Sequence, residues 1–236
     1  MKKRYLCSIV LVALIVASAF VFAACRGGVK TEKDWNDAID FLKNCNAATV
    51  SYEKNEYTNL HIKEEITTWT VAFDYESGVL YSNKAVKKYH IGIADDATYT
   101  QTYAVVEGSE VKVYTKQTVN TSYSAWTGKT ITCDNDEAAL LKLRELYQEF
   151  LTELGVDDLK YGDYKFSFNK YEKTETVGSN KTVYDVKFEK GKLSEYSLNG
   201  KPASGSQSID RCNMKTVITY SAEVEEPSGL DDTNWQ

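Results

Sequence analysis

Side chains able to act as catalytic acids, bases or nucleophiles are few in this sequence and poorly placed for catalysis. Its two histidines, His61 and His90, lie in stretches with strand-like alternation, and neither belongs to a His-Glu-x-x-His helix. No Gly-x-Ser-x-Gly elbow or phosphate-binding glycine loop occurs. Glycosidase carboxylates face each other across a cleft, which neighbours in sequence do not do. The adjacent acidic pairs are Glu64-Glu65, Asp95-Asp96 and Asp157-Asp158. We therefore predict a protein that is not an enzyme and has no catalytic residues or cofactor.

Metal binding is equally poorly supported. Asp134, Asp136 and Glu137 resemble the start of a calcium loop, but the glycine and the distant glutamate of that loop are missing. These acids suit the beginning of a helix better. The cysteines Cys45, Cys133 and Cys212 are too widely separated for zinc-ligand spacing. We predict no metal site, and at most one disulfide, whose pairing stays open against the alternative of small buried thiols.

The N-terminus carries an export signal. Three basic residues precede an apolar stretch over 5–22, which is followed by Ala23, Ala24 and Cys25. This order resembles the lipobox of bacterial lipoproteins, with Phe22 where leucine is usual. The resemblance implies removal of residues 1–24, a lipid on Cys25, and an extracytoplasmic protein anchored to the cell membrane, or to an outer membrane if the cell has one. An uncleaved anchor and ordinary secretion are the alternatives.

Charge and length limit the partners and the number of domains. Loss of Lys2, Lys3 and Arg4 takes the net charge from −6 to about −9, so nucleic acid is a poor partner. We predict a short tether over 25–30, one domain over 31–226 and a loose polar tail over 227–236. The oligomeric state stays open.

Two amphipathic helices are expected. Thr31 is a good N-cap with Asp34 three residues later, and Trp35, Ala38, Ile39 and Leu42 then recur on one face, up to about residue 44. A second helix begins after Asp134 or Asn135 and stops at Gly155. Its apolar stripe consists of Leu140, Leu143, Leu146, Tyr147, Phe150, Leu151 and Leu154.

Strands account for most of the remaining chain. Alternation over 47–132 places Thr67, Trp69, Val71, Phe73 and Tyr75 on one face. Later strands are expected at 164–171, 183–188, 193–198 and 216–224. Turns are expected at Glu76-Ser77-Gly78, Asp95-Asp96, Gly108-Ser109, Lys190-Gly191 and Asn199-Gly200. This order predicts an α+β fold, a large, curved, mainly antiparallel sheet of nine to eleven strands covered by the two helices.

The order of elements resembles the lipoprotein-carrier fold of LolA-like carriers and mycobacterial lipid-binding lipoproteins, including the stretches 186–193 and 216–220. The resemblance implies a half-open barrel that encloses an apolar cavity for acyl chains. Strand tyrosines are abundant, and they either pack as ordinary half-buried residues or line such a cavity. The lining that we predict is Trp69, Phe73, Tyr89, Tyr99, Tyr103, Leu143 and Phe150. The expected function is non-enzymatic binding of a lipid or another apolar ligand. The alternative is a structural or interaction lipoprotein that docks an envelope protein or polysaccharide.

Overall fold

The computed structural model describes residues 28–58, 60, 62–91, 93–178, 180–201 and 211–235. Over these residues it contains two α-helices, α2 (Glu32–Asn44) and α3 (Asp136–Glu153), and thirteen strands. Three short 3-10 helices lie at Val156–Asp158, Tyr161–Asp163 and Leu230–Asp232. The strands are β1 (Ala47–Tyr57), β2 (Lys63–Asp74), β3 (Val79–His90), β4 (Ile93–Glu107), β5 (Glu110–Val119), β6 (Ser122–Tyr123), β7 (Thr127–Thr132), β8 (Lys165–Ser167), β9 (Lys170–Val177), β10 (Asn180–Glu189), β11 (Lys192–Gly200), β12 (Arg211–Thr219) and β13 (Asn234–Trp235).

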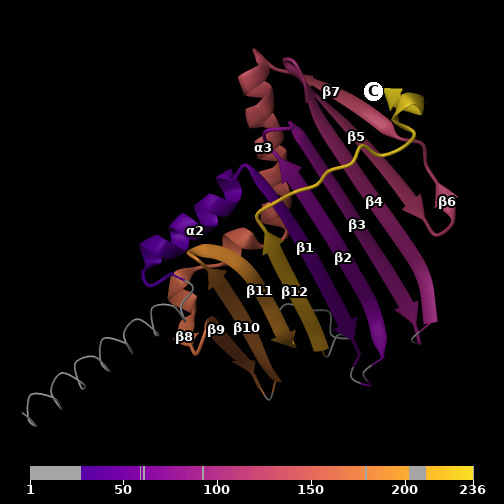
Figure 1. Ribbon diagram of the computed structural model, residues 1–236. Coiled ribbons are helices and arrows are strands. Elements are labelled where there is room, and N and C mark those ends of the chain that lie inside the picture. Colours follow the sequence, from indigo (N-terminus) through magenta and orange to yellow (C-terminus); the bar gives the residue numbers. More distant parts are fainter. Residues whose placement is uncertain are drawn as a thin grey trace, which may run out of the picture.

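All of these strands form one open sheet in the order β13-β7-β5-β4-β3-β2-β1-β12-β11-β10-β9-β8, with β6 beside β5 (Figure 1). Every pairing is antiparallel except that of β13 with β7. The predicted α+β class with a large, mainly antiparallel sheet is therefore confirmed. The strand count exceeds the nine to eleven expected, because several strands are very short.

Both expected helices are present with the expected ends. The Thr31 hydroxyl accepts a hydrogen bond from the Asp34 amide at 3.1 Å, and the Asp34 carboxylate accepts one from the Thr31 amide at 3.0 Å. This reciprocal capping box fixes the start of α2. In α3 the Asn135 side chain accepts from the Ala138 amide, and Gly155 takes a left-handed φ of 79° just beyond the helix.

The helices pack on one face of the sheet, where described side chains form a continuous core. Trp35 of α2 and Tyr147 of α3 are both fully buried. The Tyr147 ring stacks on Phe73 with a centroid separation of 4.4 Å, and its hydroxyl donates to the Leu42 carbonyl, which joins the two helices. Trp35 meets the ring of Phe188 at 4.8 Å. Side chains of both helices thus pack directly against those of the sheet.

A second, smaller core lies on the opposite face of the sheet. Tyr103, Tyr114 and Trp126 are buried there beneath the C-terminal segment, which crosses the sheet from β12 to β7 (Figure 1). The Trp126 indole donates to the Ser228 carbonyl at 3.2 Å. A side chain on Gly128 would collide with Thr233 and Trp235, so the close approach of this segment requires glycine there. The tail that we expected to be loose instead packs on the sheet, because its apolar residues cover these rings.

Turn prediction succeeded at three places and failed at two. Glu76-Ser77-Gly78, Gly108-Ser109 and Lys190-Gly191 are turns with positive φ at their glycines. Asp95 and Asp96 instead lie within β4, where the register shift opposite Lys88 and Tyr89 accommodates an extra residue. Gly200 pairs with Thr182 and Cys212 inside the sheet, so Asn199-Gly200 is not a turn.

Two strand boundaries also need correction. The expected strand over 164–171 is interrupted by a turn in which Phe168 has a φ of 55°, and this turn joins the short β8 to β9, which continues to Val177. The last long strand, expected over 216–224, runs instead over Arg211–Thr219. It ends there because the chain turns across the opposite face, and the Thr49 hydroxyl donates to the Ser221 carbonyl at 2.8 Å.

Candidate functional site

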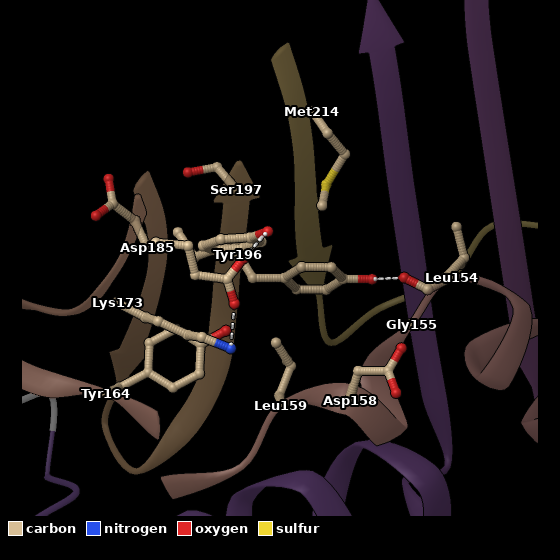
Figure 2. A pocket seen from close by; sticks show the side chains of 12 residues that line it. Leu154, Gly155, Asp158, Leu159, Tyr164, Lys173, Asp185, Tyr196, Ser197 and Met214 are labelled. Carbon is tan, nitrogen blue, oxygen red and sulfur yellow. Dashed lines mark hydrogen bonds and ion pairs between the residues drawn. The ribbon is translucent and has the colours of Figure 1, made fainter. Parts of the chain in front are cut away.

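A cavity of about 200 Å³ lies between β9–β12 and the segment that follows α3 (Figure 2). It is more enclosed than three other hollows that the described residues form. We call it the β9–β12 pocket. Its lining consists of Leu154, Gly155, Asp158, Leu159, Tyr164, Lys173, Glu175, Tyr184, Asp185, Tyr196, Ser197 and Met214. The pocket thus has aromatic and aliphatic walls with a few charged groups.

The apolar side of the pocket is held in place by one buried hydrogen bond. The Tyr196 hydroxyl donates to the Leu154 carbonyl at 2.7 Å, which ties β11 to the end of α3 (Figure 2). Leu159 and Met214 complete this side, and Tyr196 itself is only 3% exposed. Burial raises the pKa of Tyr196 to about 12. The hydroxyl therefore remains a neutral donor throughout the physiological range.

The polar side of the pocket is a paired charge cluster. Lys173 Nζ lies 2.9 Å from Glu175 Oε1 and 3.3 Å from Asp163 Oδ2, and the Tyr184 hydroxyl donates to Glu175 Oε2 at 2.9 Å. The hydrogen bond to Glu175 raises the pKa of Lys173, and the bond from Lys173 lowers the pKa of Glu175. Burial raises the pKa of Tyr184 to about 12. Lys173, Glu175 and Tyr184 therefore keep their ordinary charges at neutral pH.

The charge balance of this side limits what can bind there. One cation, Lys173, faces the carboxylates of Glu175 and Asp163, and the carboxylate of Asp158 lies on the lining as well. The net negative field would repel an added phosphate or carboxylate, whereas it would not repel a neutral or cationic group. The pocket therefore suits a ligand whose buried part is apolar and whose adjoining polar group is neutral or positive.

The volume limits the occupant further. An engineered apolar cavity of about 150 Å³ holds one benzene molecule, and pockets for drug-sized ligands span roughly 300–1,000 Å³. A cavity of about 200 Å³ therefore accepts one ring or a short acyl segment rather than a whole lipid.

The structure divides the predicted site residues between the two faces of the sheet. Trp69, Phe73, Leu143 and Phe150 lie on the helix-bearing face, where Trp69 and Phe150 meet edge to face at 5.7 Å. Their own packing fills the space that we expected them to line. The Trp69 indole donates to Ser82 Oγ at 2.7 Å, so its polar atom is satisfied.

The three predicted tyrosines lie on the other face. Tyr99 and Tyr103 are four residues apart on β4, and Tyr103 packs 6.0 Å from Tyr114 in the smaller core. Tyr89 lies near the end of β3, with Lys63 Nζ 5.6 Å from its ring. Because side chains alternate between faces along a strand, these residues cannot share one cavity with Trp69 and Phe73.

Local sequence patterns did not indicate the residues that line the β9–β12 pocket. Lys173 and Glu175 are two apart on a strand, which places them on one face, and this signal was available. The register Lys173↔Tyr184 and the segment 154–159 that closes the pocket were not readable from local patterns.

The other candidate groups lie elsewhere. His90 is exposed at the end of β3, whereas His61 and Cys25 lie outside the described residues. Cys45, Cys133 and Cys212 are all free thiols. Asp157 pairs with Lys43 of α2. Within the described ranges no group of three His, Cys, Asp or Glu side chains could hold a metal ion.

Comparison with known proteins adds no family to these observations. Neither the models of known protein families nor the curated proteins compared with this chain gave a match. In the part of the chain that the structure describes, neither helix combines the length and apolar character needed to cross a bilayer.

Proposed function

We propose that the chain is the precursor of a membrane-anchored, extracytoplasmic bacterial lipoprotein that binds an apolar ligand, such as a lipid, without catalysing a reaction. The N-terminal order of basic residues, apolar stretch, small residues and Cys25 supports the lipid anchor. The chain enters the fold three residues later. The Tyr171 hydroxyl donates to the Val29 carbonyl at 2.9 Å and the Tyr161 hydroxyl to the Lys30 carbonyl at 3.1 Å. A lipid on Cys25 would therefore hold the domain on a short tether.

We extend this proposal to the likeness with lipoprotein carriers. One sheet face carries both helices and the larger core, as a half-open barrel closed by helices would. A sheet of this length also has to curve, because each strand is rotated against its neighbour. Curvature towards α2 and α3 would give the carrier-like shape.

The observation that carries the binding proposal is the β9–β12 pocket. Its apolar and aromatic walls adjoin the larger core. Its size fits one apolar group of the ligand, with the remainder outside. A neutral apolar dye such as N-phenyl-1-naphthylamine therefore serves as the probe.

Dye fluorescence with two matched variants tests this function. Met214→Phe enlarges a side chain that lines the pocket, whereas Val217→Phe enlarges an exposed side chain of the same strand on the other face. We expect wild type and Val217→Phe to enhance dye fluorescence, and Met214→Phe to lose most of the enhancement. Equal enhancement by the two variants, or none by wild type, would refute the pocket as the binding site. Lipid extraction followed by mass spectrometry of protein purified from membranes then identifies the natural ligand.

A second function is favoured by a neighbouring hollow of about 340 Å³, which shares Asp185, Ser197 and Met214 with the β9–β12 pocket. Its lining is mostly polar: Glu53, Asn55, Asp185, Asn199, Asn213 and Lys215. Asp185 and Asn213 each keep one buried oxygen that lacks a hydrogen-bond partner among the described residues. Such a row of amides and carboxylates suits a polysaccharide or a polar protein surface. Reduced mobility in gels containing envelope polysaccharide, abolished by Asn55→Ala, would support this docking function over the first.

A further inference from the structure

Four exposed apolar side chains lie at the tips of three hairpins. Leu60 lies between β1 and β2, Ile91 lies between β3 and β4, Ile93 begins β4, and Val177 ends β9. Their exposed fractions are 75%, 75%, 74% and 60%. We call these four residues the apolar tips. Because neighbouring strands are antiparallel, the three hairpins lie at the same end of the sheet (Figure 1).

Strand register puts the tips at a common level. One row of paired residues crosses seven strands: Thr182, Gly200, Cys212, Glu56, Glu65, Lys88 and Asp96. Each tip lies a few residues beyond this row. The hairpins occupy positions from β4 to β9, and with about 4.8 Å between strands the tips span roughly 30 Å.

The three hairpins differ in charge from most connections at the other end of the sheet, although Lys201 and Arg211 flank the β11–β12 connection at their own end. The segments 58–62, 90–93 and 177–180 contain no Asp, Glu, Lys or Arg. At the opposite end, the connections 75–78, 107–110, 132–135 and 189–192 all carry at least one charged residue. The short β8–β9 turn, with exposed Phe168, is the exception there. The apolar tips therefore lie in segments that carry no formal charge.

Ile91 has a backbone conformation that isoleucine rarely adopts. Its φ is 50°, a left-handed conformation that glycine or asparagine adopts at much lower cost than a β-branched residue. The side chain is largely exposed and lies outside both apolar cores of the described residues. Packing among the described residues therefore does not explain isoleucine at this position, whereas a contact with another molecule would explain it.

We propose that the apolar tips insert into the interfacial layer of a lipid bilayer. Separate side chains on convex protrusions spread over roughly 30 Å suit a deformable lipid surface, whereas a protein partner would require a continuous complementary patch. The lysines directly behind the tips, Lys63, Lys88 and Lys181, can extend their charged ends to the headgroups. The absence of charge at the tips implies binding driven by apolar burial and not by salt-sensitive attraction.

Vesicle sedimentation tests this inference independently of the lipid on Cys25. The chain from Arg26 to Gln236 lacks the lipidated cysteine and retains every contact described above, all of which lie within residues 28–235. The probe is large phosphatidylcholine vesicles, at low and at high salt. Leu60→Ser combined with Ile93→Ser removes two tips. Leu141→Ser combined with Phe168→Ser removes two exposed apolar side chains elsewhere and is the matched control.

We expect wild type and the control to sediment with vesicles at both salt concentrations. The tip variant should partition about tenfold less, since two partly buried aliphatic side chains account for at least that factor. Unchanged circular dichroism shows that each variant is folded. Sedimentation of the tip variant equal to that of wild type would overturn the inference, as would loss of binding at high salt. Absence of binding by wild type would overturn it too, and would assign the tips to a protein partner.

Discussion

Cooperative unfolding at alkaline pH is expected from the burial of tyrosine hydroxyls. Burial raises the pKa values of Tyr164, Tyr184 and Tyr196 from the ordinary 10 to about 12, and it also raises those of Tyr52, Tyr147 and Tyr220. A raised pKa means that the folded protein holds these protons more tightly than the unfolded chain. Their contribution to stability is therefore complete below pH 10 and is lost as the pH rises through 12.

Tyr196 gives the magnitude, because it is only 3% exposed. A shift from 10 to about 12 corresponds to about 3 kcal/mol of unfolding free energy lost once both states are ionised. Total stabilities of domains are about 5–15 kcal/mol, so a few such tyrosines suffice to unfold the protein. We expect unfolding between pH 10 and 12.

The assay combines tyrosinate absorbance with far-ultraviolet circular dichroism along a pH titration. The buried tyrosines should ionise together with the loss of strand signal, after the exposed ones. Tyr196→Phe cannot ionise at this position and should show a shallower fall of stability with pH, whereas Tyr123→Phe, at a side chain 78% exposed, should match wild type. Ionisation of every tyrosine near pH 10 with an intact fold at pH 12 would refute the reasoning.

Three further predictions concern local features. Under native conditions a thiol reagent should modify Cys133 first, because Cys45 and Cys212 are buried and burial raises the pKa of Cys212 to about 11; simultaneous modification of all three would contradict this. Thr31→Ala removes the N-cap of α2 and should lower the unfolding free energy by about 1 kcal/mol in urea titrations, with Thr31→Ser near wild type. Ile91→Asn should relieve a strained left-handed conformation and raise the unfolding free energy by about 1 kcal/mol, and a decrease would show that the isoleucine serves the fold.

Sequence patterns predicted the elements whose signals are local. The capping box of Thr31 and Asp34 and the apolar stripe of α3 depend only on residues within a few positions, and both helices are present as expected. The face shared by Trp69, Val71 and Phe73 also follows from alternation alone, and these residues are buried together.

Failures occurred where distant backbone decides the conformation. Gly200 resembles half of a hairpin turn, but a Cβ there would lie 2.4 Å from the Lys181 carbonyl oxygen, so glycine serves close strand packing. The β8–β9 turn carries Phe168 in a left-handed conformation and so lacks the usual glycine or asparagine signal at that position. The β9–β12 pocket depends on both the β9–β10 register and the segment after α3. No local pattern contains that information.

The two tyrosine hydrogen bonds that fix Val29 and Lys30 have a consequence for orientation. From Cys25 to Val29 the chain can span at most about 14 Å. Val29 is held by Tyr171 near the start of β9, and Val177 at the end of that strand is about 20 Å away along it. If the lipid and the apolar tips contact the same membrane, the strands must tilt away from the bilayer normal or the tips must sink several ångströms into the bilayer, because the tether is shorter than this stretch of β9.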